Sequence, residues 1–194
     1  MARMIVSLED IHCRDTEDVS GGDTFYLTGV VTDGYATAGI ATRPVWINDD
    51  NKKGMTKRFG EGGGVVFDAV IPDNHILKVA FAAFDEDAAK DWAKRGQAVT
   101  MIAGAVGQAL KQVPNPAAVA AGAILPIAVA AVGGLMSLDG DDHLGNDARE
   151  FPVWAIPPGE HWQLCQIAGR KRGRFGGWWS SWQYTVRYRV IKHA

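Results

Sequence analysis

The stretches Leu77–Asp87, LKVAFAAFDED, and Asp139–Gly145, DGDDHLG, decide how this chain is organised. The first stretch alternates and then becomes continuously apolar up to Phe84, which is typical of a strand buried on at least one face. It ends in Asp85-Glu86-Asp87, and the second stretch adds three further aspartates. Carboxylates grouped on a tight loop suit calcium, which takes roughly six to eight oxygen ligands. About fifty residues with almost no charge separate the two acidic stretches.

Size and composition favour a single domain. The chain has 194 residues, enough for a substantial core, and its net charge of −2 gives no general attraction to nucleic acid. Cys13 and Cys165 are too few for a disulfide scaffold, so we expect two buried free thiols, with a disulfide as the alternative. The N-terminal residues MARMIVSLED lack the apolar core and cleavage site of a secretory signal. We therefore expect a cytoplasmic location, with export by another route left open.

Eight segments have the alternating or β-branched pattern of strands, with turn signals between them. They are Met4–Cys13, Thr24–Thr32, Pro44–Asn48, Val65–Ile71, Ile76–Phe84, Glu150–Ile156, Trp162–Ala168 and Trp182–Lys192. This pattern predicts a mainly β fold in which residues 1–194 form one domain, an eight-stranded antiparallel β-sandwich. An α-helical hairpin is predicted as an insertion over residues 88–138.

The predicted hairpin has two helices joined at Pro114-Asn115-Pro116. The first, from about Ala88 to Val113, carries an apolar stripe that runs from Trp92 to Leu110. The second, Ala117–Met136, has no charged residue, but alanine and glycine dominate it and insert weakly into a bilayer. Packing within the protein is the favoured interpretation. Insertion into a membrane when triggered and homo-oligomerisation through the Ala/Gly surface are the alternatives.

The order of the predicted strands groups the acidic residues. If successive strands are antiparallel, the loops after the first, third, fifth and seventh strands open at the same end of the sandwich. Those loops hold twelve of the 22 acidic residues, namely Asp15, Glu17, Asp18, Asp23, Asp49, Asp50, Asp85, Glu86, Asp87, Asp139, Asp141 and Asp142. Such a concentration of charge is costly unless a cation neutralises it, and oxygen-only clusters select hard cations. Calcium is the predicted ligand, and ordinary solvated turns are the alternative, because Asp favours turns.

The acidic loops resemble those of C2 domains, a family of calcium- and phospholipid-binding β-sandwiches. The first loop of that family reads Asp-x-x-Gly-x-x-Asp-Pro-Tyr, and Asp18–Tyr26, DVSGGDTFY, is similar. Its two aspartates are one residue closer together, and Thr24-Phe25 replaces the proline. The third loop reads Asp-x-Asp and later Asp-hydrophobic-hydrophobic-Gly, which Asp85–Asp87 and Asp142–Gly145 match in two separated halves. The resemblance implies calcium ligands at Asp18, Asp23, Asp85, Asp87 and Asp142, with Asp139 and Asp141 as further candidates.

A second metal motif lies within one segment. Asp139–His143, with Asp147 and Glu150 further on, has the ligand offsets of an EF-hand loop. Leu144 stands where the sharp turn of that loop needs glycine, and no amphipathic helix follows. This is the weaker of the two metal interpretations.

Residues 170–182, RKRGRFGGWWSSW, predict a membrane contact at the acidic end. Cations attract anionic head groups, and tryptophan prefers the membrane interface. The predicted lipid-binding residues are Arg170, Lys171, Arg172, Arg174, Trp178 and Trp179. The alternatives are a solvated basic turn beside core tryptophans and a site for single-stranded nucleic acid, which the acidic end would repel without metal.

No catalytic constellation is predicted. His12 and Cys13 are adjacent on a strand and face opposite sides, and Gly60–Gly64 is not followed by the Gly-Lys-Ser/Thr of a phosphate-binding loop. We therefore expect a binding module and no enzyme. The first hypothesis is a calcium-dependent peripheral membrane module for anionic phospholipid surfaces. The second is a metal-free module that interacts through the Ala/Gly-rich hairpin.

Neutralising Asp85 and Asp87 separates these two hypotheses. Asp85→Asn combined with Asp87→Asn is expected to abolish any rise in melting temperature caused by calcium, because both carboxylates would be ligands. Thermal unfolding with and without calcium measures this effect. An unchanged calcium-dependent shift in the variant would contradict the ligand assignment.

Overall fold

The computed structural model describes residues 1–16, 22–48, 54–60, 63–85, 142–172 and 179–194. These residues form ten strands and one short 3₁₀ helix, η2 (Val153–Ala155). The strands are β1 (Ala2–Asp15), β2 (Asp23–Thr32), β3 (Thr37–Ala41), β4 (Val45–Ile47), β5 (Met55–Arg58), β6 (Gly64–Ile71), β7 (Ile76–Asp85), β8 (Asp142–Pro152), β9 (Gly159–Arg172) and β10 (Trp179–His193).

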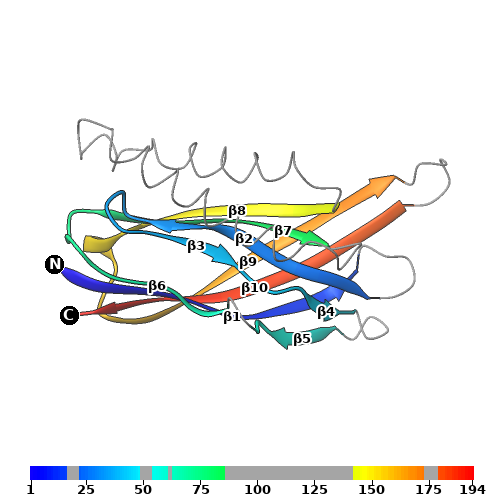
Figure 1. The fold of residues 1–194 in the computed structure, drawn as a ribbon, viewed down its shortest axis with the longest axis horizontal. Helices are drawn as coiled ribbons and strands as arrows, with labels where there is room; N and C mark the ends of the chain where they lie inside the picture. The colour runs from blue at the N-terminus through cyan, green and yellow to red at the C-terminus, as the bar shows by residue number, and fades with distance from the viewer. Residues whose placement is uncertain (17–21, 49–53, 61–62, 86–141, 173–178) are drawn as a thin grey trace.

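The strands pair into two antiparallel sheets of five strands each (Figure 1). Sheet 1 has the order β5-β1-β10-β9, and β6 also pairs with β1. Sheet 2 has the order β3-β2-β7-β8, and β4 also pairs with β2. The chain therefore crosses repeatedly between the sheets, and long-range pairing rather than local hairpins holds most of the fold together.

The main core lies between the inner faces of the two sheets. Phe25 of sheet 2 packs against Tyr184 of sheet 1, with ring centroids 5.1 Å apart, and Phe81 meets Tyr188 edge-on at 6.0 Å. All four side chains are at most 1% exposed. Aromatic pairs of this kind add to the apolar burial that joins the sheets.

Strands β2 and β7 are buried on both faces, which explains their nearly continuous apolar sequences. On the outer face of sheet 2, Tyr26 stacks on Phe84 at 5.2 Å. On the same face Lys78 is 1% exposed, and its Nζ lies 2.9 Å from Glu150 Oε1 in an ion pair whose geometry does not make a hydrogen bond. The centre of sheet 2 is thus the most enclosed part of the described structure.

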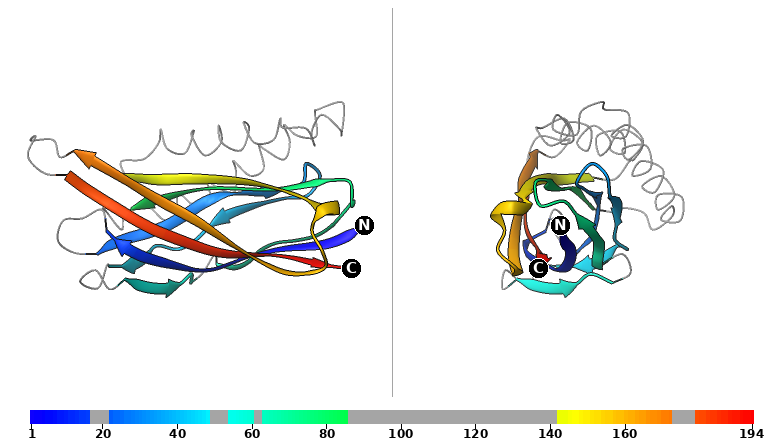
Figure 2. Two further views of the ribbon diagram at one scale, coloured as in Figure 1. Left: turned by 180° about the vertical axis from the view of Figure 1, so that it is seen from behind. Right: turned by 90° about the vertical axis from the view of Figure 1, so that its left-hand side faces the viewer.

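The two ends of the sandwich differ in what they carry. The chain termini lie together at one end, which we call the terminal end (Figures 1 and 2). At the other, the acidic end, β1, β7 and β9 finish and β2, β8 and β10 begin. The strand ends that the structure describes therefore lie together at one end, as the strand order predicted.

The predicted fold class is wrong in two respects. The described residues form ten strands in place of eight, and they contain no α-helix, so the eight-stranded sandwich with an inserted helical hairpin is not what the structure presents. The hairpin was assigned to residues 88–138, which fall within 86–141 and outside the described residues. In the described part of the chain, no helix has the length and apolar character needed to span a membrane.

The missed strands depend on their partners. The sequence of β3, TAGIA, has no alternation, and β5, MTKR, has three exposed residues, so each extends because β2 or β1 offers a free edge. Strand β8 was predicted at Glu150–Ile156 but begins at Asp142, because β7 pairs with a polar stretch that precedes the predicted strand.

Gly145 has φ 154°, a conformation that L side chains rarely adopt, and lies beside the irregularity at Ala83 and Phe84.

Gly29 provides a test of the central strand pairing. A Cβ at this position would lie 2.1 Å from the Ala80 carbonyl oxygen and 2.6 Å from Phe81 Cα, so Gly29→Ala must push β2 away from β7. We expect a loss of unfolding free energy of at least about 2 kcal/mol in urea denaturation. Gly60→Ala is the matched control, because nothing lies within 4 Å of a Cβ there. Equal losses in the two variants would contradict the close approach.

Candidate functional site

Three aspartates end or begin neighbouring strands at the acidic end of sheet 2. Asp23 is the first residue of β2, Asp85 the last of β7, and Asp142 the first of β8. The register pairs Phe25 with Asp85 and Asp85 with Asp142 across the three strands. Residues more than 100 positions apart in the sequence are thereby brought to one sheet end.

The carboxylates of Asp23 and Asp85 point toward the space between the sheets. Asp23 lies two residues before the core residue Phe25, so the two share a face of β2, and the paired Asp85 shares that face on β7. Asp23 is 1% exposed and Asp85 3% exposed. Buried carboxylates are rare unless they are paired with cations or hydrogen-bonded.

Each of these carboxylates accepts a hydrogen bond from a buried or partly buried donor. The Tyr184 hydroxyl, which belongs to β10 of the opposite sheet, donates to Asp23 Oδ2. The Thr24 backbone N–H donates to Asp85 Oδ1 at 2.6 Å. These bonds orient both carboxylates at the end of the sandwich and offset part of the cost of burying them.

This donor set fits a hard divalent cation. Both side chains offer oxygen, and oxygen ligands without nitrogen or sulfur select calcium or magnesium over transition metals. The described residues alone contain no group of three or more His, Cys, Asp or Glu side chains in a metal-binding arrangement. Of the other predicted ligands, Asp18, Asp87, Asp139 and Asp141 lie outside the described residues, and Asp142 is placed by its backbone.

The EF-hand interpretation is wrong for the residues that the structure describes. Asp147 and Glu150 lie in strand β8 and not in a loop. Asp147 Oδ2 accepts a hydrogen bond from Arg149 Nε at 2.9 Å, and Glu150 pairs with Lys78. Glu150 therefore pairs within sheet 2, whereas Asp147 contacts Arg149, which also donates to the Leu164 carbonyl oxygen of sheet 1.

The predicted lipid-binding residues that are described lie at the acidic end. Arg170 is exposed near the end of β9, and Lys171 and Arg172 continue that strand, paired with Ser180 and Trp179 of β10. The remaining two, Arg174 and Trp178, lie outside the described residues. The basic end of β9 therefore lies at the same end of the molecule as Asp23 and Asp85.

The side chain of Trp182 is partly buried, although the sequence grouped it with exposed aromatic residues. Its indole Nε1 donates to the Leu144 carbonyl oxygen at 2.7 Å and so links β10 to β8 across the sheets. Its ring also packs against the core cluster and over Gly169, where a Cβ would come within 2.3 Å of it. A side chain larger than hydrogen at position 169 would displace this ring.

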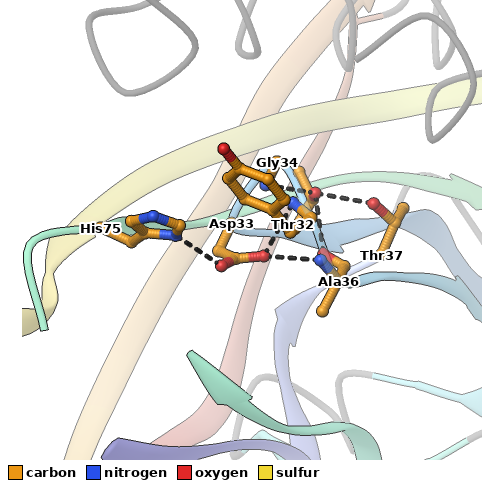
Figure 3. A network of polar contacts seen from close by, with 7 residues as sticks. Thr32, Asp33, Gly34, Ala36, Thr37 and His75 are labelled. Atoms are coloured by element: carbon orange, nitrogen blue, oxygen red, sulfur yellow. Dashed lines mark hydrogen bonds and ion pairs between the residues drawn. The ribbon is translucent and has the colours of Figure 1, made fainter. Parts of the chain in front are cut away.

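At the terminal end, a different buried carboxylate joins two turns (Figure 3). Asp33 Oδ1 accepts hydrogen bonds from the backbone N–H groups of Tyr35 and Ala36, at 3.0 and 2.7 Å. Asp33 Oδ2 lies 2.8 Å from His75 Nδ1, and the Tyr35 ring stacks on the His75 ring at 5.1 Å. This network fastens the turn after β2 to the turn after β6 and is structural in character.

The two cysteines are free and buried, as predicted. Burial raises the pKa of the Cys165 thiol, and the nearby Asp147 carboxylate raises it further. A thiol in this state stays protonated at neutral pH and is a poor nucleophile or metal ligand. The expectation that the chain is not an enzyme stays a prediction.

Three contributors to the acidic end were not predicted from the sequence. Tyr184 was predicted only as part of an alternating strand, and it donates to Asp23. Thr24 donates to Asp85 through its backbone N–H. Trp46 of β4 has a side chain that is 53% exposed. The Trp46 ring lies so close to Gly22 that a Cβ there would come within 2.7 Å of it. The alternation of β10 would have identified Tyr184 as inward-facing, but not its partner in the other sheet.

Comparisons with known proteins found a structural similarity and no match by sequence. No protein-family model matches the chain, and no curated protein matches it. Over 100% of its length the chain is similar to a solved structure titled "Structure of a C2 domain", which is covered over 100% of its own length. That similarity has a sequence identity of 16% and a TM-score of 0.37. At this similarity it assigns no ligand, site or function to the chain.

Asp33 is the residue whose removal should most disturb the terminal end. Asp33→Ala deletes the acceptor for two backbone N–H groups and for His75, and we expect a loss of about 2–3 kcal/mol in unfolding free energy. Asp68→Ala is the control, since Asp68 is a surface partner of Arg3 and surface pairs contribute little. Urea denaturation of both variants measures the difference. An Asp33→Ala variant as stable as Asp68→Ala would contradict the role of the network.

Proposed function

We propose that this protein is a calcium-binding module that associates with anionic membrane surfaces through its acidic end. One observation carries the proposal. The pairing of β2 with β7 places two nearly fully buried carboxylates, Asp23 and Asp85, at the same end as the basic end of β9. The carboxylates alone would repel an anionic surface that the cations of β9 attract, and a divalent cation held by the carboxylates would remove this repulsion.

The electrostatic argument has two steps. The carboxylates of the acidic end repel anionic head groups in the absence of a cation, and calcium would neutralise them. Asp23 and Asp85 would hold the ion, with Asp18, Asp87, Asp139, Asp141 and Asp142 as the proposed further ligands. Once the repulsion is removed, the cations of β9 are worth roughly 1 kcal/mol each near an anionic membrane.

Aromatic residues at the same end support the membrane assignment. Trp46 pairs with Thr24 beside Asp23, and its side chain is half exposed. Trp179 begins β10 opposite Arg172. Tryptophan at the level of the lipid head groups is favourable, because the ring is apolar and its N–H donates to water or to head groups.

Co-sedimentation with vesicles tests the proposal directly. The protein should sediment with vesicles of phosphatidylserine and phosphatidylcholine in calcium, and should stay in the supernatant with a chelator or with phosphatidylcholine alone. Equal binding in calcium and chelator would contradict the calcium requirement. Absence of binding in both conditions would contradict the membrane association.

Single-charge variants refine the same experiment. Arg170→Gln is expected to weaken binding about fivefold, the effect of removing one cation near an anionic surface. Arg3→Gln is the matched control, since it removes the same charge at the terminal end, where Arg3 pairs with Asp68. Equal weakening by both variants would indicate general charge attraction and would contradict a membrane contact at the acidic end.

A further inference from the structure

We infer that Tyr184 is a positioning residue, which holds the Asp23 carboxylate in place from the opposite sheet before any cation binds. The calcium part of this inference rests on the proposed function. The hydrogen bond itself does not, because it is a contact between two buried side chains of the protein.

Packing fixes the place of the Tyr184 ring. Tyr184 is 0% exposed, and its backbone pairs with Cys13 on one side and Ile167 on the other, in the middle of sheet 1. The ring lies against Phe25 at 5.1 Å, tilted by 46°. Phe25 is two residues from Asp23 on the same face of β2 and belongs to the core. The Tyr184 ring packs against Phe25, and its hydroxyl reaches the Asp23 carboxylate.

Tyr188 shows what the Tyr184 hydroxyl adds. Both tyrosines lie on the inner face of β10, both are 0% exposed, and both rings contact a phenylalanine of sheet 2. The Tyr188 hydroxyl, however, has no hydrogen-bond partner within the described structure. The two residues therefore differ mainly in whether the hydroxyl meets a carboxylate, which makes Tyr188 an internal control.

Trp182 makes a second contact of the same kind. It precedes Tyr184 by two residues on the inner face of β10, and its indole N–H donates to the carbonyl of Leu144, two residues after Asp142. Strand β10 thus holds the start of β2 through Tyr184 and the start of β8 through Trp182. One strand of the other sheet thus contacts Asp23 of the first predicted acidic loop and Leu144, in the second half of the third.

Such outer contacts matter because a cation binds more tightly to ligands that are already oriented. Removing a residue that orients a ligand commonly weakens metal binding by about 10- to 100-fold. A residue that only fills the core changes stability and leaves the affinity for the ion unchanged. Stability and affinity together therefore separate a positioning role from a purely structural one.

The first arm of the test uses the metal-free protein. Tyr184→Phe is expected to lower the melting temperature by about 3–10 °C, because a buried charged group loses a donor. In an Asp23→Asn background the same substitution should have a much smaller effect, since the partners are coupled. Tyr188→Phe is expected to leave the melting temperature within about 2 °C or to raise it. Additive effects of Tyr184→Phe and Asp23→Asn would overturn the inference.

The second arm titrates calcium chloride into the 194-residue chain by calorimetry. Tyr184→Phe is expected to bind calcium about 10- to 100-fold more weakly than the wild type, and Tyr188→Phe to bind it as the wild type does. Wild-type binding with an unchanged affinity in Tyr184→Phe would overturn the positioning role. A wild type that binds no calcium would overturn the proposed function and this calcium role, while the first arm would still decide the Tyr184–Asp23 contact.

Discussion

The pairing of β2 with β7 at the centre of sheet 2 is the constraint on which the rest of the structure depends. Both strands are buried on both faces, and Gly29 lets them approach more closely than any residue with a Cβ would. Because the pairing is antiparallel, the start of β2 and the end of β7 must meet. The position of Asp23 beside the end of β7 is therefore a consequence of how the core is built.

Burying carboxylates at that position has a free-energy cost that the protein offsets with donors from distant parts of the chain. The Tyr184 hydroxyl reaches Asp23 from sheet 1, and the Thr24 N–H reaches Asp85 from the adjacent strand. Hydrogen bonds to charged groups are stronger than those between neutral groups. They orient the carboxylates without removing the negative charge that a cation would neutralise in the proposed function.

The buried aspartate of the terminal end shows a different use of the same chemistry. Asp33 accepts hydrogen bonds from two backbone N–H groups of its own turn and contacts His75. These three contacts all lie within the two turns at the terminal end. Asp23 is instead bound to the opposite sheet, at the end where basic and aromatic residues also gather. This difference in surroundings, and not a difference in residue type, separates the structural carboxylate from the candidate ligand.

Periodicity in the sequence was sufficient for the strands with strong apolar patterns, such as β2, β7 and β10, and strand order was sufficient to place their ends together. It was insufficient for β3, β5 and the first half of β8, whose residues extend only because a neighbouring strand offers hydrogen bonds. The aspartates were evident from the sequence alone. The tertiary structure decided that these aspartates are buried. It also decided that Tyr184, and not Tyr188, donates a hydrogen bond to Asp23. Both outcomes depend on distances between strands of different sheets.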